Sequence, residues 1–241
     1  MNIDRRRLWQ EAFGDADEFL DLFSSTAYAP ERSRTITVDG NLAAALYWFD
    51  CEYDGKKIAY IYAVATAKAY RGRGLCHRLM AQTHEHLQEN GYVGAILVPG
   101  SQALFDLYAG MGYKTCSFMS EMTCEAEGTI EYREINKTAY AELRRLFLPR
   151  GGVVQEGANL DFLEKQARFF AGRDFLLAAQ VNGDTLYGLE LLGDHATASA
   201  LVAAMGCKHG RFRMPGTEIP FAMYYSLQDH AMPTYFGFAF D

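Results

Sequence analysis

The chain has 241 residues, of which 49% are hydrophobic and 14% aromatic, and its formal charge is −7 at pH 7. A chain of this composition can bury a sizeable core, which argues against disorder, and its acidic balance argues against nucleic acid as a partner. No apolar run approaches the roughly 18 residues that span a bilayer, so we expect no membrane association.

The use of cysteine indicates a reducing compartment. The five cysteines form an odd number and show no C-x-x-C spacing, which argues against a disulfide framework and against a zinc knuckle. Residues 1–19 contain arginines but no apolar stretch, so no secretory signal is predicted. We therefore expect a cytoplasmic protein without a bound metal.

The first part of the chain predicts two helices followed by three strands. Apolar residues recur at helical spacing within residues 5–27. Residues 34–49 have the pattern of two strands around a tight Asp39-Gly40 turn. A second Asp-Gly turn precedes residues 56–66. This third strand is nearly all apolar toward its end, so we expect it at the centre of a sheet.

A helix, a short strand, a short helix and a closing strand follow. Leucine and methionine recur at helical spacing from Leu75, and the pattern ends near Gly91. Residues 94–100 predict a buried strand, residues 101–110 a short helix, and residues 114–124 a closing strand.

The second half of the chain starts afresh after a polar candidate linker. It predicts helices near residues 138–147 and 159–170, a hairpin around an Asn-Gly turn, a helix over residues 194–205, and strand-like segments to the end. The order of these elements parallels the first half, which indicates a weak internal repeat. We expect two domains, residues 1–126 and residues 127–241.

The sequence Y-R-G-R-G-L-C at residues 70–76 stands where an aliphatic strand ends and a helix begins. The first amides of a helix lack intrahelical acceptors and carry the positive end of the helix dipole, so they form a ready anion site. Gly72 and Gly74 let a bulky anion approach the backbone, while Arg71 and Arg73 add charge and forked donors. The turn therefore predicts a phosphate site, and an ordinary turn with solvated arginines is the alternative.

Two common phosphate motifs do not match this turn. His77 stands where a G-x-G-x-x-G fingerprint needs its third glycine, and no segment supplies the Walker A pattern. The stretch AVATAKAYRGRGLCHRLM (residues 63–80) instead resembles motif A of the GCN5-related N-acetyltransferases (GNAT), which is R/Q-x-x-G-x-G/A between the fourth strand and the next helix. Arg71 and Gly74 fill its first and fourth positions, and Cys76 replaces the final small residue.

A second resemblance lies downstream, in the order that this family has. The stretch LVPGSQALFDLYAGMGY (residues 97–113) resembles the family's fifth strand and fourth helix, which end in Y-x-x-x-G-F/Y. Here these positions are Tyr108, Gly112 and Tyr113. The resemblance covers roughly residues 5–124. The second half is similar, more faintly, to the degenerate second domain of tandem members, including the enhanced-intracellular-survival type.

The resemblance implies an α/β (α+β) fold, with a mixed central sheet whose fourth and fifth strands splay apart, flanking helices, and a smaller GNAT-like second domain. It also implies that acetyl-CoA lies between the splayed strands as co-substrate. The binding residues that it implies are the backbone of Val64, Ala65 and Thr66 for pantetheine, Arg71 with the amides of Gly72, Arg73, Gly74, Leu75, Cys76 and His77 for the pyrophosphate, and Gly100 with Ser101 for the pantetheine or acetyl end.

By the same resemblance, we expect an N-acetyltransferase that moves an acetyl group from acetyl-CoA to an amine of a small molecule or peptide by direct attack. Tyr108 is the expected acid for the leaving thiolate, because a phenol stays protonated at neutral pH. The alternative is that Tyr108 only packs in an apolar stripe. A backbone amide near Val64 or Ala65 is the expected oxyanion donor.

The sequence offers more than one candidate for the general base. Residues 56–66 contain no carboxylate, so Asp50 and Glu52 on the preceding strand are candidates, with solvated strand-end charges as the alternative. In the enhanced-intracellular-survival type, a carboxylate at the chain end reaches the catalytic centre, which makes Asp241 a further catalytic candidate.

Some alternatives stay open at this stage. A non-catalytic acyl-CoA-binding or regulatory GNAT-fold protein is the alternative function, and the acetyl acceptor and the oligomeric state are left open. Tyr47, Trp48 and Tyr62 either line an acceptor pocket or pack in the core. His77 and His84 lie two turns apart on one helix face, which a solvated surface explains better than metal ligation.

Overall fold

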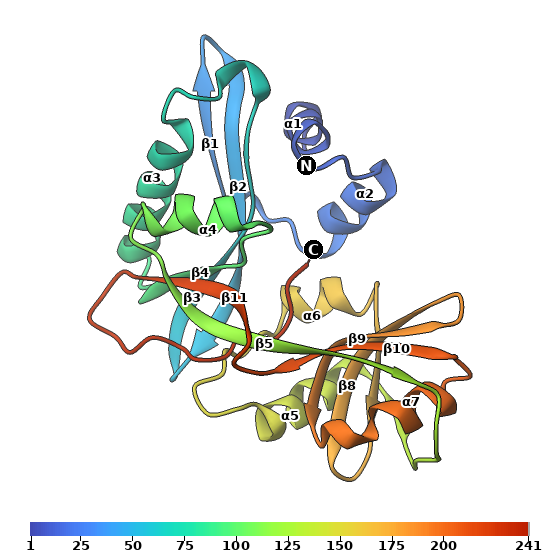
Figure 1. The fold of residues 1–241 in the computed structure, drawn as a ribbon. Helices are drawn as coiled ribbons and strands as arrows, with labels where there is room; N and C mark the ends of the chain where they lie inside the picture. The colour runs from blue at the N-terminus through green and yellow to red at the C-terminus, as the bar shows by residue number, and fades with distance from the viewer. Residues whose placement is uncertain (241) are drawn as a thin grey trace. The chain divides into compact units, whose positions relative to one another are not determined.

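In the computed structural model, which describes residues 1–240, the chain divides into two compact units (Figure 1). Unit 1 comprises residues Met1–Lys114, Gln155–Phe162 and Met223–Met232, and unit 2 comprises the other described residues. The boundary expected at residue 126 therefore falls inside a segment of unit 2, Thr115–Val154. Each unit is described below by itself.

The two Asp-Gly turns build the hairpins of unit 1. Asp39 and Gly40 have φ angles of +49° and +77°, so both central residues of the turn are left-handed, as a tight hairpin between twisted strands requires. Asp54 and Gly55 repeat this geometry. The strands of the unit are β1 (Ser33–Val38), β2 (Asn41–Tyr53), β3 (Lys56–Thr66), β4 (Gly94–Leu97) and the last residues of β11 (Ile219–Ser226).

The sheet of unit 1 is mixed, as expected. Its strand order is β1-β2-β3-β4-β11. The pairs β1–β2, β2–β3 and β4–β11 are antiparallel, whereas β3 and β4 are parallel. The parallel pair is joined by a helix, which is the connection that parallel neighbours need.

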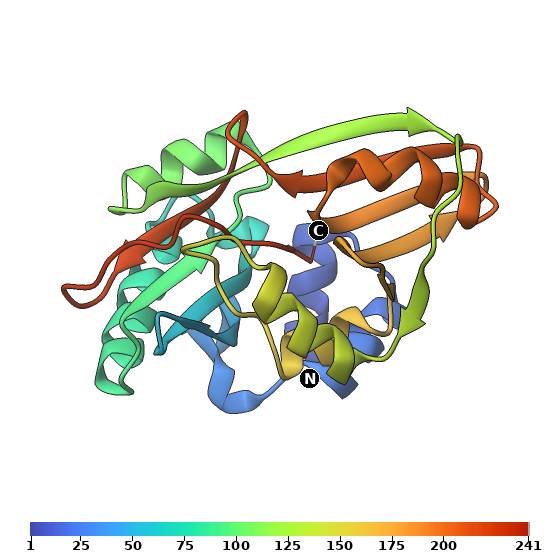
Figure 2. The same ribbon diagram turned by 90° about the horizontal axis from the view of Figure 1, so that it is seen from below.

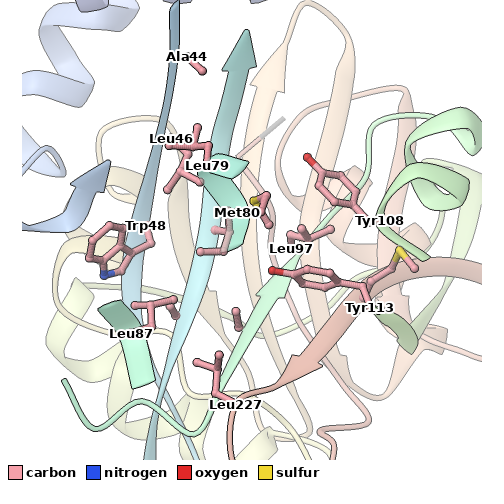
Figure 3. Packing of buried hydrophobic residues seen from close by; sticks show 14 of the residues in the cluster. Ala44, Leu46, Trp48, Leu79, Met80, Leu87, Leu97, Tyr108, Tyr113 and Leu227 are labelled. Atoms are coloured by element: carbon pink, nitrogen blue, oxygen red, sulfur yellow. The ribbon is translucent and has the colours of Figure 1, made fainter. Parts of the chain in front are cut away.

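Helices lie on both sides of this sheet (Figure 1). They are α1 (Ile3–Phe13), α2 (Asp17–Thr26), α3 (Leu75–Glu89), α4 (Gln102–Ala109), most of α6 (Ala158–Leu163), and the 3-10 turns η1 (Pro30–Arg32) and η2 (Lys68–Tyr70). Side chains alternate along β2, so Leu46 and Trp48 join the α3 core that Figure 3 shows, while Tyr47 and Phe49 pack on the aromatic rings of α1 and α2.

Within unit 2, the strand order is β5-β10-β9-β8-β7-β6. The elements of this unit are β5 (Lys114–Glu125), β6 (Arg133–Ile135), α5 (Lys137–Phe147), β7 (Arg168–Ala171), β8 (Phe175–Asn182), β9 (Thr185–Gly193), η3 (His195–Thr197), α7 (Ala198–Ala204) and β10 (His209–Pro215). β9 and β10 are parallel, and α7 packs on β10 (Figure 2).

The helix expected over residues 159–170 is wrong in length. The helix α6 ends at Leu163, and Arg168–Ala171 form the strand β7. A strand turns successive side chains to opposite faces, and here Phe169 stacks on Tyr140 of α5 while Phe170 joins the core beneath α7. Burial of two adjacent aromatic rings on two faces therefore decides against a longer helix.

A buried ion pair links α5 and β9 within unit 2. Arg144 Nε lies 2.7 Å from Glu190 Oε2, and both side chains are almost fully buried. The hydroxyls of Tyr140 and Tyr235 donate hydrogen bonds to the same carboxylate. The backbone at Gly237 passes so close that a Cβ there would lie 1.8 Å from Glu190 Oε1. The pair thus also holds the segment that follows β11 inside unit 2.

Among residues 1–240, no helix combines the length and the apolar character needed to cross a membrane.

Candidate functional site

The strands β3 and β4 part after a short stretch of pairing. They pair only over Ile58–Tyr60, although β3 continues to Thr66. The register against β2 shifts within this extension, and Ala63 has a φ of +50°, which marks a bulge. Past Tyr60, the β4-facing edge of β3 can therefore accept an added extended chain, and this edge carries the expected pantetheine residues Val64, Ala65 and Thr66.

The turn after β3 leads into an uncapped helix. Gly74 is the N-cap of α3, and no side chain accepts a hydrogen bond from the first amides of the helix. Gly72 and Gly74 have φ angles of +74° and +71°, which residues with a Cβ rarely adopt, and a Cβ at either would meet no atom within 4 Å. An added side chain would have room at both glycines, so the backbone at the start of α3 is not covered there.

The two arginines of the turn also stabilise the turn itself. Arg71 Nε donates to the carbonyl oxygen of Thr66 at 3.1 Å, and Arg73 Nη2 donates to that of Ala69 at 3.2 Å. Arg73 also lies over the ring of Tyr70. Both arginines are exposed, so their positive charge remains beside the helix start.

The second predicted segment begins at the mouth of α4. Ser101 is the N-cap of this helix, but its side chain makes no capping hydrogen bond. A Cβ on Gly100 would meet no atom within 4 Å, and both residues are exposed. The start of α4, next to the end of β4, is therefore a second exposed helix N-terminus without a side-chain cap.

Tyr108 lies on α4 with its ring in the core of unit 1. Its side chain is 7% exposed and meets Tyr113 edge to face, with ring centroids 5.8 Å apart (Figure 3). Burial raises the pKa of Tyr108 well above the ordinary 10, so its phenol stays protonated at neutral pH. Burial thus both packs the ring of this residue and keeps its hydroxyl protonated.

Cys76 is half-buried against the same core. Burial raises the pKa of its thiol, which opposes formation of a reactive thiolate even at a helix N-terminus. The structure therefore favours a packing role for this side chain, while its backbone amide remains part of the helix start.

The two carboxylates proposed on β2 lie away from the splayed strands. Asp50 pairs with Ala59 of β3, before the strands part, and Glu52 is two residues further away. Asp50 accepts a hydrogen bond from the Tyr92 hydroxyl and lies 3.6 Å from both Arg32 Nη1 and Lys57 Nζ. These ion pairs support a structural role for Asp50. Asp241, the other catalytic candidate, lies outside the described residues.

The three aromatic residues considered for an acceptor pocket do not share a surface. Tyr47 and Tyr62 pack against Trp9 of α1, whereas Trp48 lies on the opposite face and donates to the Tyr92 hydroxyl. The interpretation that all three line one pocket is wrong, because consecutive positions 47 and 48 of a strand must face opposite ways.

His84 is buried, contrary to the expected solvated surface. Its side chain is 9% exposed, its Nε2 lies 2.8 Å from the Tyr113 hydroxyl, and its ring stacks on Tyr225 at 4.1 Å. Desolvation lowers its pKa to about 4. His84 also lines a pocket of about 440 Å³ beside α3. Its helical spacing from Met80 and Leu87 was the sequence signal that pointed to burial.

No group of three or more His, Cys, Asp or Glu side chains within residues 1–240 is arranged to hold a metal ion.

Comparison with known proteins agrees with this geometry. Residues 4–116 match the family model described as an acetyltransferase (GNAT) domain. Among solved structures, the chain is similar to a GCN5-related N-acetyltransferase from Kribbella flavida, with a TM-score of 0.70 and 17% identity over 92% of this chain and 68% of that chain. No curated protein sequence matches the chain.

Two further solved structures share the fold over most of the chain. A GCN5-related N-acetyltransferase from Anabaena variabilis has a TM-score of 0.69 and 14% identity, covering 92% of this chain and 69% of that chain. Eis1 from Mycobacterium abscessus has a TM-score of 0.63 and 10% identity, covering 92% of this chain and 70% of that chain. At these identities, the likeness establishes the fold.

Proposed function

Residues 4–116 belong to the GNAT acetyltransferase family, and on this premise we propose that the protein is an N-acetyltransferase that uses acetyl-CoA and an amine of a small molecule or peptide. Family and fold both support acyl transfer. The observation that carries the finer proposal is that β3 continues beyond its pairing with β4 and leads directly into the uncapped start of α3. An extended arm that ends in a diphosphate has the shape and charge for this continuous surface.

The residues present fit coenzyme A. Backbone groups of Val64 to Thr66 would pair with the pantetheine amides, and the amides of Gly72 to His77, with Arg71 and Arg73 beside them, would hold the pyrophosphate. Gly100 and Ser101 would approach the pantetheine or acetyl end. The bound thioester supplies an acetyl carbonyl that an amine can attack.

Tyr108 is the residue that we propose as the acid for the departing thiol. Its raised pKa keeps the phenol protonated at neutral pH, so the hydroxyl can donate a hydrogen bond, or its proton, to the departing thiolate sulfur. A backbone amide near Val64 or Ala65 would donate to the carbonyl oxygen as negative charge develops there. Asp241 is kept as the proposed proton acceptor for the attacking amine, since Asp50 and Glu52 lie elsewhere.

Steady-state kinetics with a panel of amines tests the proposal. Thiol release from acetyl-CoA should require an amine, and Tyr108→Phe should lower kcat about 100-fold with little change in the KM for acetyl-CoA, because the ring and its packing remain. Tyr132→Phe, which alters an exposed tyrosine of unit 2, is the matched control. An unchanged kcat in Tyr108→Phe would refute the acid role.

Asp241 needs its own variant. Asp241→Asn and removal of residue 241 should both lower kcat at neutral pH and shift its acid limb. An unchanged pH–rate profile in both would remove Asp241 from the mechanism.

One observation favours a second candidate function. Asp50 is held in ion pairs, and Glu52 lies two residues further from the splayed strands, so neither carboxylate considered on β2 is placed there as a base. An acyl-CoA-binding or regulatory protein would need none. Tight binding of acetyl-CoA by calorimetry, without turnover on any amine of the panel, would establish this alternative.

We propose no nucleic acid or membrane partner and a cytoplasmic location. The acidic charge opposes binding to a phosphate backbone, and the five cysteines are free thiols, as is usual in a reducing compartment.

A further inference from the structure

Tyr108 and Tyr113 are brought together by the turn that ends α4. The amide of Tyr113 donates to the carbonyl oxygen of Tyr108 at 3.1 Å, and Gly112 completes the turn with a φ of +95°. The two rings then meet edge to face, with centroids 5.8 Å apart (Figure 3). Tyr113 thus provides part of the surface against which the Tyr108 ring rests.

Tyr113 is itself fixed by a hydrogen bond to α3. Its side chain is only 2% exposed, and its hydroxyl lies 2.8 Å from His84 Nε2. Burial raises the pKa of Tyr113 and lowers that of His84, so a neutral phenol and a neutral imidazole share this hydrogen bond. A buried hydroxyl without a partner would be costly, and His84 supplies the partner.

The imidazole is held in turn from the side of β11. Tyr225 stacks on it, with ring centroids 4.1 Å apart and an interplanar angle of 15°. Tyr225 also packs against the turn, because a Cβ on Gly112 would lie 3.2 Å from its ring. Three elements of unit 1 therefore fix the position of the Tyr113 ring, and His84 is the polar member of the set.

The orientation of Tyr108 depends on this packing. The part of the chain that the structure describes gives the Tyr108 hydroxyl no hydrogen bond, so the position of this group follows from the contacts of its ring. A ring that is held only by packing moves when its neighbour moves, and misplacement of a reacting group by about 1 Å costs up to about 100-fold in rate.

We propose that His84 is a positioning residue for acetyl transfer: its hydrogen bond to Tyr113 fixes the ring that aims the Tyr108 hydroxyl. This inference rests on the proposed function, in which Tyr108 is the acid. His84 does not touch the substrate and acts only through Tyr113.

A double-mutant cycle between His84 and Tyr108 tests this role. His84→Leu removes the partner of the Tyr113 hydroxyl and should lower kcat about tenfold, while the KM for acetyl-CoA stays unchanged because the helix start is untouched. His84→Gln keeps a group that can donate or accept a hydrogen bond, and it should restore most of the rate. In the Tyr108→Phe background, His84→Leu should cause no further loss of kcat, since no hydroxyl remains to be aimed.

Two additional variants keep the test decisive. Tyr113→Phe removes the hydroxyl but keeps the ring, so it should lower kcat without the unpaired hydroxyl that His84→Leu leaves behind. It replaces His84→Leu in the test if that variant does not fold. His86→Leu changes a neighbouring histidine on α3 that contacts Trp48 instead, and it should leave kcat unchanged. Melting curves establish that each variant is folded at the assay temperature.

The outcomes separate this inference from the proposed function. If His84→Leu lowers kcat equally in both backgrounds, its role is only structural, and the inference is overturned. An unchanged kcat in both His84→Leu and Tyr113→Phe overturns it as well. If Tyr108→Phe leaves kcat unchanged, the acid role fails first, and the positioning role fails with it.

Discussion

At the scale of single residues, burial rather than position in the sequence decides the chemistry of this protein. Tyr108 keeps its proton because it is buried, Cys76 keeps its proton for the same reason, and His84 is held neutral by desolvation. Each of these side chains lies on a helix whose sequence is amphipathic. The tertiary contacts that bury the side chain then set its pKa.

His84 predicts a specific loss of stability in acid. Its pKa is 6.5 in an unfolded chain and about 4 in the folded one, so between these values the unfolded state binds more protons and gains relative stability. The contribution of neutral His84 to stability is fully present above pH 6.5. As the pH falls to 4, the free energy of unfolding decreases by about 3 kcal/mol in total. Urea unfolding at a series of pH values measures it.

His84→Gln provides the comparison for this experiment. The variant has no group that titrates at this position, so its free energy of unfolding should fall less steeply between pH 6.5 and pH 4, whereas above pH 7 the two curves should run parallel. Identical slopes for the two proteins would contradict the assigned burial of His84.

At the scale of elements, the turn at the start of α3 has the same backbone strain as a hairpin turn elsewhere in unit 1. Gly74 is left-handed at φ +71°, and Gly55 in the β2–β3 hairpin is left-handed at φ +67°. Neither glycine has an atom within 4 Å of its Cβ position. The two positions therefore have the same backbone strain. They differ in that Gly74 lies at the start of α3, whereas Gly55 lies in a hairpin turn.

Alanine at each of these glycines should separate strain from binding. Both Gly74→Ala and Gly55→Ala should lower the free energy of unfolding by about 1 kcal/mol, because a Cβ disfavours the left-handed region. Only Gly74→Ala should also weaken coenzyme A binding in calorimetry, since its methyl group enters the proposed diphosphate site. Equal affinities in the two variants would argue against that site.

The buried pair between α5 and β9 supports a further prediction. Glu190→Gln removes the carboxylate that faces the buried charge of Arg144, and it should destabilise the protein by about 3–5 kcal/mol. Glu134→Gln breaks the Arg168–Glu134 pair, which is exposed and 2.6 Å long, and it should cost at most about 1 kcal/mol. The urea midpoints of the two variants test this prediction. Similar losses of stability would show that burial does not make the Arg144–Glu190 pair more important than the exposed pair.

At the scale of the whole molecule, unit 1 is not continuous in sequence. The last residues of β11 pair with β4, Met223 opposite Leu97, and Phe162 packs on the rings of Phe23 and Phe49. Asn159 Nδ2 also donates to the carbonyl oxygen of Asp50. These segments lie beyond residue 126, so the unit that carries the proposed acetyl-CoA site depends on later parts of the chain.

A fragment of residues 1–126 should therefore not fold as the full chain does. It lacks the antiparallel partner of β4 and the aromatic ring that closes the core on the α1 and α2 side, so an exposed sheet edge and a large apolar surface would remain. Circular dichroism should show no cooperative melting for the fragment and one for the full chain. A cooperative transition of the fragment near that of the full chain would contradict this expectation.

Local chemistry explains what could be predicted from sequence. The Asp-Gly hairpins, the helix after residues 70–74 and the family motifs depend on neighbours within a few positions, and the structure confirms the hairpins, the helix and the GNAT fold. The site residues themselves remain predictions, although the end of β3 beyond its pairing with β4 and the uncapped α3 lie where the motifs suggested.

Long-range packing explains the rest. The sequence by itself determined the family, the mixed sheet and the glycine turn, because the patterns that predict them are short stretches of contiguous residues. Only the tertiary structure decided that His84 is buried beneath Tyr225, that Asp50 is turned into ion pairs, and that residues 155–162 and 223–232 complete unit 1. Those outcomes depend on which side chains from distant parts of the chain pack together. A polar group is desolvated only once this packing has formed.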